Sequence, residues 1–87
     1  MNKTIKIELS KQDLDHIYND VLSYTLDRKV CVTKGRAYNH SVYEDIEITP
    51  VEREELKALG VYDRINLLKR IEEVRKNNFP ECPTTNS

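Results

Sequence analysis

The chain has 87 residues, of which 38% are hydrophobic and 33% are charged, and its formal net charge is -1. This length allows one hydrophobic core, and the small net charge excludes a general polyanion binder, because such proteins carry a large excess of Lys and Arg. The two cysteines, Cys31 and Cys82, have no CxxC or Cys/His spacing, so neither a metal site nor a cofactor is expected.

The N-terminal part of the chain predicts one strand followed by one helix. Residues 4–9, TIKIEL, place three apolar side chains on one side and Lys6 and Glu8 on the other, which is the alternation of a half-buried strand. Ser10 can cap a helix over residues 11–26, whose apolar side chains share one face at helical spacing.

A hairpin is predicted next. The stretch Lys29 to Thr33, KVCVT, is rich in β-branched residues, and the Lys34-Gly35 pair that follows suits a tight turn. The return arm is predicted within residues 42–48, VYEDIEI, where apolar and acidic residues alternate, while its register stays open.

Two helices are predicted in the C-terminal part. Thr49, Pro50 and Glu52 together form a helix start, with a capping hydroxyl, a proline preset for the first turn and a glutamate that can close a capping box. Gly60 should end this helix, because glycine readily adopts the left-handed conformation at helix ends, and a second helix should begin near Asp63.

These elements predict an α+β domain, in which a small antiparallel sheet of the N-terminal strand and the hairpin is covered by an N-terminal helix and a C-terminal helix pair. The domain should span residues 1–77, followed by a flexible tail over residues 78–87. A single core of this size is thin, so a homodimer is considered. The first ten residues contain no signal peptide or membrane anchor, which predicts a cytoplasmic protein without membrane contacts.

Residues 54–74, EELKALGVYDRINLLKRIEEV, resemble the closing part of sterile alpha motif domains, where an acidic stretch, a Leu-Gly pair and an amphipathic last helix follow one another. The resemblance covers about a quarter of the chain and implies a helix-turn-helix packing there. No function is carried over from it, because a capped helix, a glycine stop and a leucine-rich helix are generic.

An acidic stretch is the first candidate binding surface, since six acids surround the single cation Arg53 between residues 44 and 55. Such a patch can dock onto a basic protein surface, and tyrosines are enriched at interfaces. A solvated strand face and ordinary helix-start acids remain the alternative explanation. The predicted protein-binding residues are Tyr38, Tyr43, Glu44, Asp45, Glu47, Glu52, Glu54 and Glu55.

A basic hairpin is the second candidate surface and would serve a nucleic-acid-binding regulator. Cations beside an aromatic side chain can contact phosphates and stack on a base, although four charges make a small footprint. A solvated hairpin whose cations discourage edge pairing is the alternative explanation. The residues of this alternative surround Lys34-Gly35 and are Arg28, Lys29, Lys34, Arg36 and Tyr38.

No pattern in the sequence predicts catalysis. His16 lies near Asp13 and Asp20 on the first helix, and His40 has no nucleophile with an evident partner. The function predicted from the sequence is therefore a small non-enzymatic protein that regulates or inhibits a protein partner by surface occlusion. Short chains without motifs and rich in Lys, Asn and Ile are common in phages and mobile elements, which suggests an inhibitor of a host or defence system in the host cytoplasm.

Overall fold

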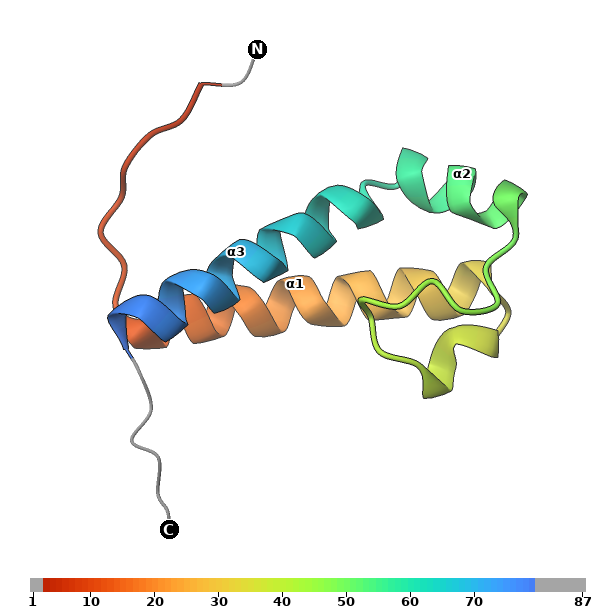
Figure 1. Ribbon diagram of the computed structural model, residues 1–87, viewed down its shortest axis with the longest axis horizontal. Coiled ribbons are helices and arrows are strands. Elements are labelled where there is room, and N and C mark those ends of the chain that lie inside the picture. Colours follow the sequence, from red (N-terminus) through yellow and green to blue (C-terminus); the bar gives the residue numbers. More distant parts are fainter. Residues whose placement is uncertain (1–2, 80–87) are drawn as a thin grey trace, which may run out of the picture.

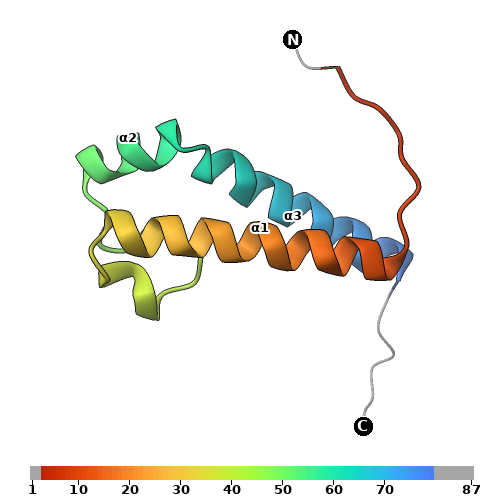
Figure 2. The ribbon, with the colours of Figure 1, turned by 180° about the vertical axis from the view of Figure 1, so that it is seen from behind.

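The computed structural model describes residues 3–79, and every regular element within them is helical. The elements of this part of the chain are α1 (Lys11–Val32), the short 3-10 helix η1 (Arg36–Asn39), α2 (Pro50–Ala58) and α3 (Val61–Asn78). α1 and α3 lie side by side and antiparallel, so that the end of α3 lies beside the start of α1 (Figure 1). Residues 40–49, called the loop below, cross α1 and connect η1 with α2, and residues 3–9, called the arm, extend away from the start of α1 (Figure 2).

The predicted α+β fold is wrong, because residues 3–79 contain no strand and no sheet. The KVCVT stretch is the last part of α1 instead of a hairpin arm. Leu22, Leu26 and Val30 continue the apolar side of α1 at four-residue spacing, and all three are partly buried. β-branched residues disfavour a helix only slightly, so packing along this side overrides their preference.

The Lys34-Gly35 pair ends α1 and does not turn a hairpin. Both residues have a positive φ, 55° for Lys34 and 90° for Gly35. The amide of Lys34 donates to the carbonyl of Cys31 at 3.2 Å, and the amide of Gly35 donates to the carbonyl of Val30 at 2.8 Å. This pair of hydrogen bonds is the Schellman pattern, which closes the last turn of a helix.

The arm is extended but is not a half-buried strand as predicted. Ile5 and Ile7 are 86% and 70% exposed. A strand at this place would need a neighbouring strand, and the residues expected to provide one, 29–33 and 42–48, form the end of α1 and part of the loop. The alternating pattern is therefore present, but no strand within residues 3–79 pairs with it.

The predicted helix starts are confirmed. Ser10 and Asp13 form a reciprocal capping box at α1, and Thr49 and Glu52 form another at α2, directly before Pro50. α2 ends before Gly60, whose φ of 76° is left-handed, as predicted. The next helix, α3, begins at once with Val61 and continues to Asn78. Asn78, the first residue of the predicted tail, is thus helical, and residues 80–87 of that tail lie outside the described residues.

The hydrophobic core lies where α2 and the first half of α3 meet the second half of α1. Leu56, Val61 and Ile65 form its buried centre, and Val32 and Ile48 pack against it. The structure extends 17 Å along its shortest axis and 40 Å along each of the other two. Seen down this axis, α1, α2 and α3 are spread out beside one another (Figure 1). None of the helices in residues 3–79 is long and apolar enough to span a lipid bilayer.

Candidate protein-binding surface

A line of buried polar residues on α1 supports the loop and η1. Thr25, Lys29 and Thr33 are 0%, 1% and 0% exposed and follow one another at four-residue spacing, so they share one side of the helix. The hydroxyl of Thr33 donates to the carbonyl of Lys29 at 2.7 Å and accepts the amide of Ala37 at 3.1 Å. η1 is thereby attached to the end of α1.

The ammonium group of Lys29 fastens the loop to α1. Its Nζ donates to the carbonyls of Val42 at 2.9 Å and Glu44 at 2.7 Å, and it pairs with Asp45 Oδ1 at 3.3 Å. These three contacts use all three N–H donors of the lysine. A buried charge is costly unless it is paired and hydrogen-bonded, so this geometry is a structural anchor. Lys29, predicted to contact phosphate, lies in the interior.

Asp45 is the point where three other elements converge. In addition to Lys29 from α1, its carboxylate pairs with Arg53 from α2 and accepts the hydroxyl of Tyr62 from α3 at 3.2 Å. Burial alone would raise the pKa of Asp45, but the hydrogen bonds and charges of these partners lower it below its ordinary value. Burial and the charge of Asp45 raise the pKa of Tyr62. Asp45, predicted to contact a partner, is engaged inside the molecule.

Arg36 forms a second tie, between η1, the loop and α2. Its Nη1 donates to the carbonyl of Glu47 at 2.6 Å, its Nε donates to the carbonyl of Thr33 at 3.1 Å, and its Nη2 pairs with Glu52. The hydrogen bond from the amide of Thr49 lowers the pKa of Glu52, burial opposes this, and the charge of Arg36 lowers the pKa further. Glu52, like Asp45, therefore holds the fold and has no free carboxylate oxygen.

Tyr43 is a third predicted contact residue that lies partly inside. Its hydroxyl is 3.0 Å from that of Tyr18, which also donates to Glu72 at 2.9 Å. Burial and these two neighbours raise the pKa of Tyr18. The Lys69 ammonium lies 5.9 Å from the centre of the Tyr43 ring. The tyrosine thus joins the loop to α1 and α3.

The remaining four acids are exposed, and so are one apolar side chain of the loop and one of α2. Val51, on the opposite side of α2 from the buried Leu56, is 77% exposed, and Ile46 in the loop is 46% exposed. Glu54 and Glu55 lie three and four residues after Val51, which places them beside it on the outer side of the helix. We call this set the loop–α2 surface, which consists of Glu44, Ile46, Glu47, Val51, Glu54 and Glu55.

Sequence reasoning missed Val51 and Ile46 as surface residues. Ile46 was expected to lie on the apolar side of a strand, but residues 42–48 belong to the loop. Val51 had a usable signal, because a residue five positions before Leu56 lies on the far side of a helix from it. Tyr38, predicted for both surfaces, is 71% exposed on η1.

The residues of the basic alternative are mostly engaged within the molecule. Arg28 pairs with Asp27 at 2.6 Å, and its guanidinium lies 5.6 Å from the ring centre of Tyr24. With Lys29 buried and Arg36 tied to the loop, Lys34 is the remaining exposed cation of that set.

The histidines do not assemble a metal site with the acids. His40 Nε2 lies 3.3 Å from Glu47 Oε2, and no group of three potential metal ligands occurs within residues 3–79. Comparisons of the chain with protein-family models, with curated proteins and with solved structures found no match.

Proposed function

We propose that this chain is a small non-enzymatic protein that regulates or inhibits a protein partner by covering part of its surface with the loop–α2 surface. The observation that carries the proposal is the outer side of α2, where Val51 is 77% exposed between acids. An apolar centre surrounded by charged residues is the usual composition of a specific protein interface. The acidic rim favours a partner with Lys or Arg around an apolar contact.

The internal ties support this proposal because they hold the surface in one conformation. The pair of Lys29 with Asp45 fixes the loop to α1, and the pair of Arg36 with Glu52 fixes the start of α2. A surface that is ordered before binding loses less conformational entropy when a partner arrives. Two of the six acids, Asp45 and Glu52, thus anchor the loop and α2, and the other four are exposed and contact the partner.

Charge reversal on α2 tests the proposal. The full-length chain, carrying an affinity tag, is used to capture proteins from the source cell, and each captured protein is then purified and titrated. The variant Glu54→Lys/Glu55→Lys should bind at least roughly tenfold more weakly, because two attractive rim charges become repulsive. Val51→Glu should weaken binding further, because it places a charge in the apolar centre.

The matched control reverses two exposed acids away from this surface, in the variant Asp20→Lys/Glu73→Lys. It changes the net charge of the chain by the same amount, so a general loss of electrostatic attraction would affect both double variants equally. A captured protein that binds the α2 variant and the control with the same affinity as the original chain would refute the loop–α2 surface as its contact.

A further inference from the structure

The arm at the other end of the molecule has the alternating pattern of a strand, and no strand within the described part of the chain lies beside it. Residues 3–9 are extended, and their backbone makes no hydrogen bond to any other residue of the described chain. Ile5 is 86% exposed and Ile7 is 70% exposed, on the same side of the arm. A row of free backbone donors and acceptors beside exposed apolar side chains is a template for pairing with another chain.

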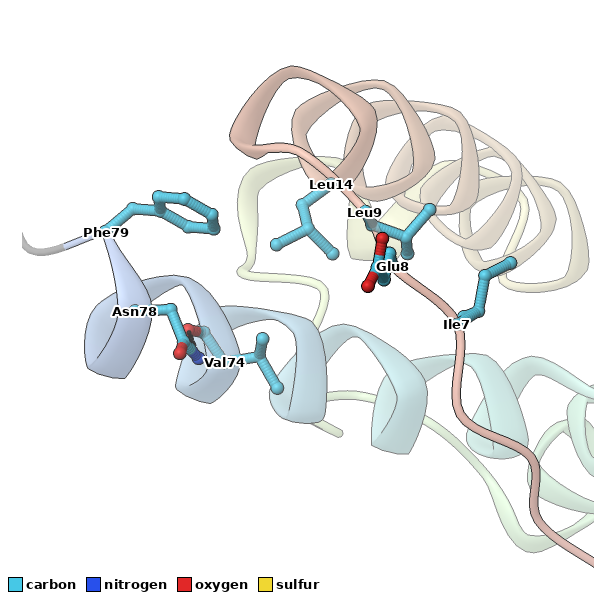
Figure 3. Close-up of a pocket in the computed structure, with 7 residues that line it drawn as sticks. All are labelled: Ile7, Glu8, Leu9, Leu14, Val74, Asn78 and Phe79. Atoms are coloured by element: carbon cyan, nitrogen blue, oxygen red, sulfur yellow. Dashed lines mark hydrogen bonds between the residues drawn. The ribbon is translucent and has the colours of Figure 1, made fainter.

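A cavity that is open to solvent lies directly beside the base of this arm, and its lining is apolar except for Glu8 and Asn78. It has a volume of about 320 Å³ and lies between the arm, the start of α1 and the end of α3. Leu9 and Leu14 lie on one side of it, and Val74 and Phe79 lie on the other (Figure 3). Val74 is 44% exposed, so the two helices leave this end of the molecule incompletely covered.

The charges of the arm are self-complementary in one antiparallel register. If two arms pair about a twofold axis at Ile7, then Lys6 of each copy lies opposite Glu8 of the other. Residues directly opposite each other in an antiparallel pair point to the same side. Ile7 therefore meets its own copy and Ile5 meets Leu9, which gives one apolar side and one side of opposite charges.

Other arrangements of two arms lack this complementarity. A twofold axis at Lys6 places two lysines opposite each other, and an axis at Glu8 places two glutamates opposite each other. A shift by one residue points apolar side chains of one copy to the charged side of the other. A parallel pair in register stacks like charges along the whole arm.

We propose that the chain forms a homodimer in which the arms of two copies pair as an antiparallel ribbon centred on Ile7. The apolar side of this ribbon lies over the cavities, because both Ile7 and Leu9 of that side line the cavity, with Glu8 between them, and Ile5 of the second copy lies beside Leu9. A two-stranded ribbon is only marginally stable by itself. The ribbon therefore gains further stability by packing on the start of α1 and the end of α3. In this homodimer the two paired arms form a two-stranded sheet between the copies, while the regular elements of residues 3–79 in each copy are helices. The loop–α2 surface does not contribute to the dimer interface.

Charge exchange tests the pairing and its register with the full-length chain. The oligomeric state of the original protein and of Lys6→Glu, Glu8→Lys and Lys6→Glu/Glu8→Lys is measured by sedimentation over a range of concentrations. Each single variant places like charges in both cross-strand pairs, so its dimer should dissociate roughly tenfold more readily. The double variant restores opposite charges and should dimerise like the original chain.

A mixture of the two single variants provides a second readout. Lys6→Glu carries two glutamates and Glu8→Lys carries two lysines at these positions, so the heterodimer is favoured over both homodimers. Because the arm lies outside the helical core, none of these substitutions should change the helix content. Far-UV circular dichroism measures the helix content and would detect a variant whose fold is disturbed.

Disulfide trapping tests the register directly, in a chain with Cys31→Ser and Cys82→Ser. Ile7→Cys should cross-link rapidly with its own copy under a glutathione redox couple, because Cα atoms of opposed residues lie within the range that a disulfide spans. Ile5→Cys should not, because the two substituted positions are about 14 Å apart in this register, yet it should cross-link with a Leu9→Cys chain.

Three results would overturn the proposal. The first is an original chain that stays monomeric at all concentrations tested, and the second is a dimer that both single charge variants leave unchanged. The third is cross-linking of Ile5→Cys with itself at the rate of Ile7→Cys. An arm that pairs with the sheet edge of a different protein would produce the first result.

Discussion

The two ends of the α1–α3 pair are built differently. At the end that carries α2, the second half of α1 is covered by η1, the loop and the start of α3, and Leu56 and Val61 are fully buried. At the end that carries the arm, the start of α1 and the end of α3 border the cavity, and Ile17 and Val74 are 36% and 44% exposed. We call these the closed end and the open end.

The difference shows how a short chain can order a segment without regular structure. The loop has few hydrogen bonds of its own, and its buried carbonyl groups need donors. Lys29 supplies donors to Val42 and Glu44, and Arg36 supplies one to Glu47. Two cations thus fix the loop at the closed end. At the open end Arg75 pairs with Asp15 between α3 and α1 at 3.2 Å, but no cation in the described chain holds the arm, which leaves apolar surface for another molecule.

The largest expected effect comes from a cavity at the closed end. Leu56→Ala should lower the free energy of unfolding by about 3 kcal/mol, because a fully buried leucine loses its contacts and leaves a void. Leu14→Ala is the matched change at the open end and should cost about 2 kcal/mol or less, since its neighbourhood already borders a cavity. Urea unfolding followed by circular dichroism measures both. Equal losses would show that the two ends are packed alike.

Removal of the Lys29 charge should rank next. Lys29→Met keeps most of the side-chain volume but leaves two carbonyls and the Asp45 carboxylate without their donor, so we expect a loss of about 3 kcal/mol. Lys11→Met at the open end is the control. Its pair with Asp15 is exposed and 3.4 Å long, and its loss should change stability by less than about 0.5 kcal/mol. A stable Lys29→Met protein would mean that the loop needs no cationic anchor.

These contacts also explain what sequence reasoning could and could not predict. The helix starts at Ser10 and Thr49 were predictable, because a capping box involves residues three positions apart. The burial of Lys29 was not, because its partners lie 13 to 16 residues further along the chain and are brought there only by the fold. Its β-branched neighbours then favoured a strand that packing overrides.

The candidate surface was predictable in part for the same reason. Glu54 and Glu55 are exposed as a helical pattern around Leu56 requires, whereas Asp45 and Glu52 are drawn inward by cations from other elements. The alternation in residues 4–9 predicted a half-buried strand, and this prediction was wrong, because a strand needs a partner and a local pattern does not reveal whether that partner lies within the same chain.

Two glycines allow a smaller test of the closed end. Gly60→Ala should cost about 1–2 kcal/mol, because φ is 76° and the new Cβ would lie 2.6 Å from Nη1 of Arg64, which donates to the carbonyls of Leu59 and Gly60. Gly35→Ala has a φ of 90° but open space around its Cβ, so it should cost about 1 kcal/mol from the backbone alone. Thermal unfolding of both variants measures the difference, and its absence would show that Arg64 moves aside freely.

The smallest expected effect is a dependence of the closed end on pH. The partners of Asp45 hold its pKa below the ordinary value of 3.8, so the folded state binds its proton less readily than the unfolded state. The stabilisation is present above pH 3.8 and is lost as the pH falls through the lower pKa of the folded state. Asp45→Asn should therefore be less stable than the original chain at neutral pH, with a difference that shrinks below about pH 4.

Tyr62→Phe separates this effect from general acid unfolding. It removes one hydrogen bond that lowers the pKa of Asp45 and leaves the charges of Lys29 and Arg53 in place. The stability lost on acidification should decrease in this variant without disappearing, since Glu52 and Asp13 also have lowered pKa values. Urea unfolding at a series of pH values gives each slope. A Tyr62→Phe slope identical to that of the original chain would show that the hydroxyl does not influence the charge of Asp45, and that the anchor of the loop consists of the two cations alone.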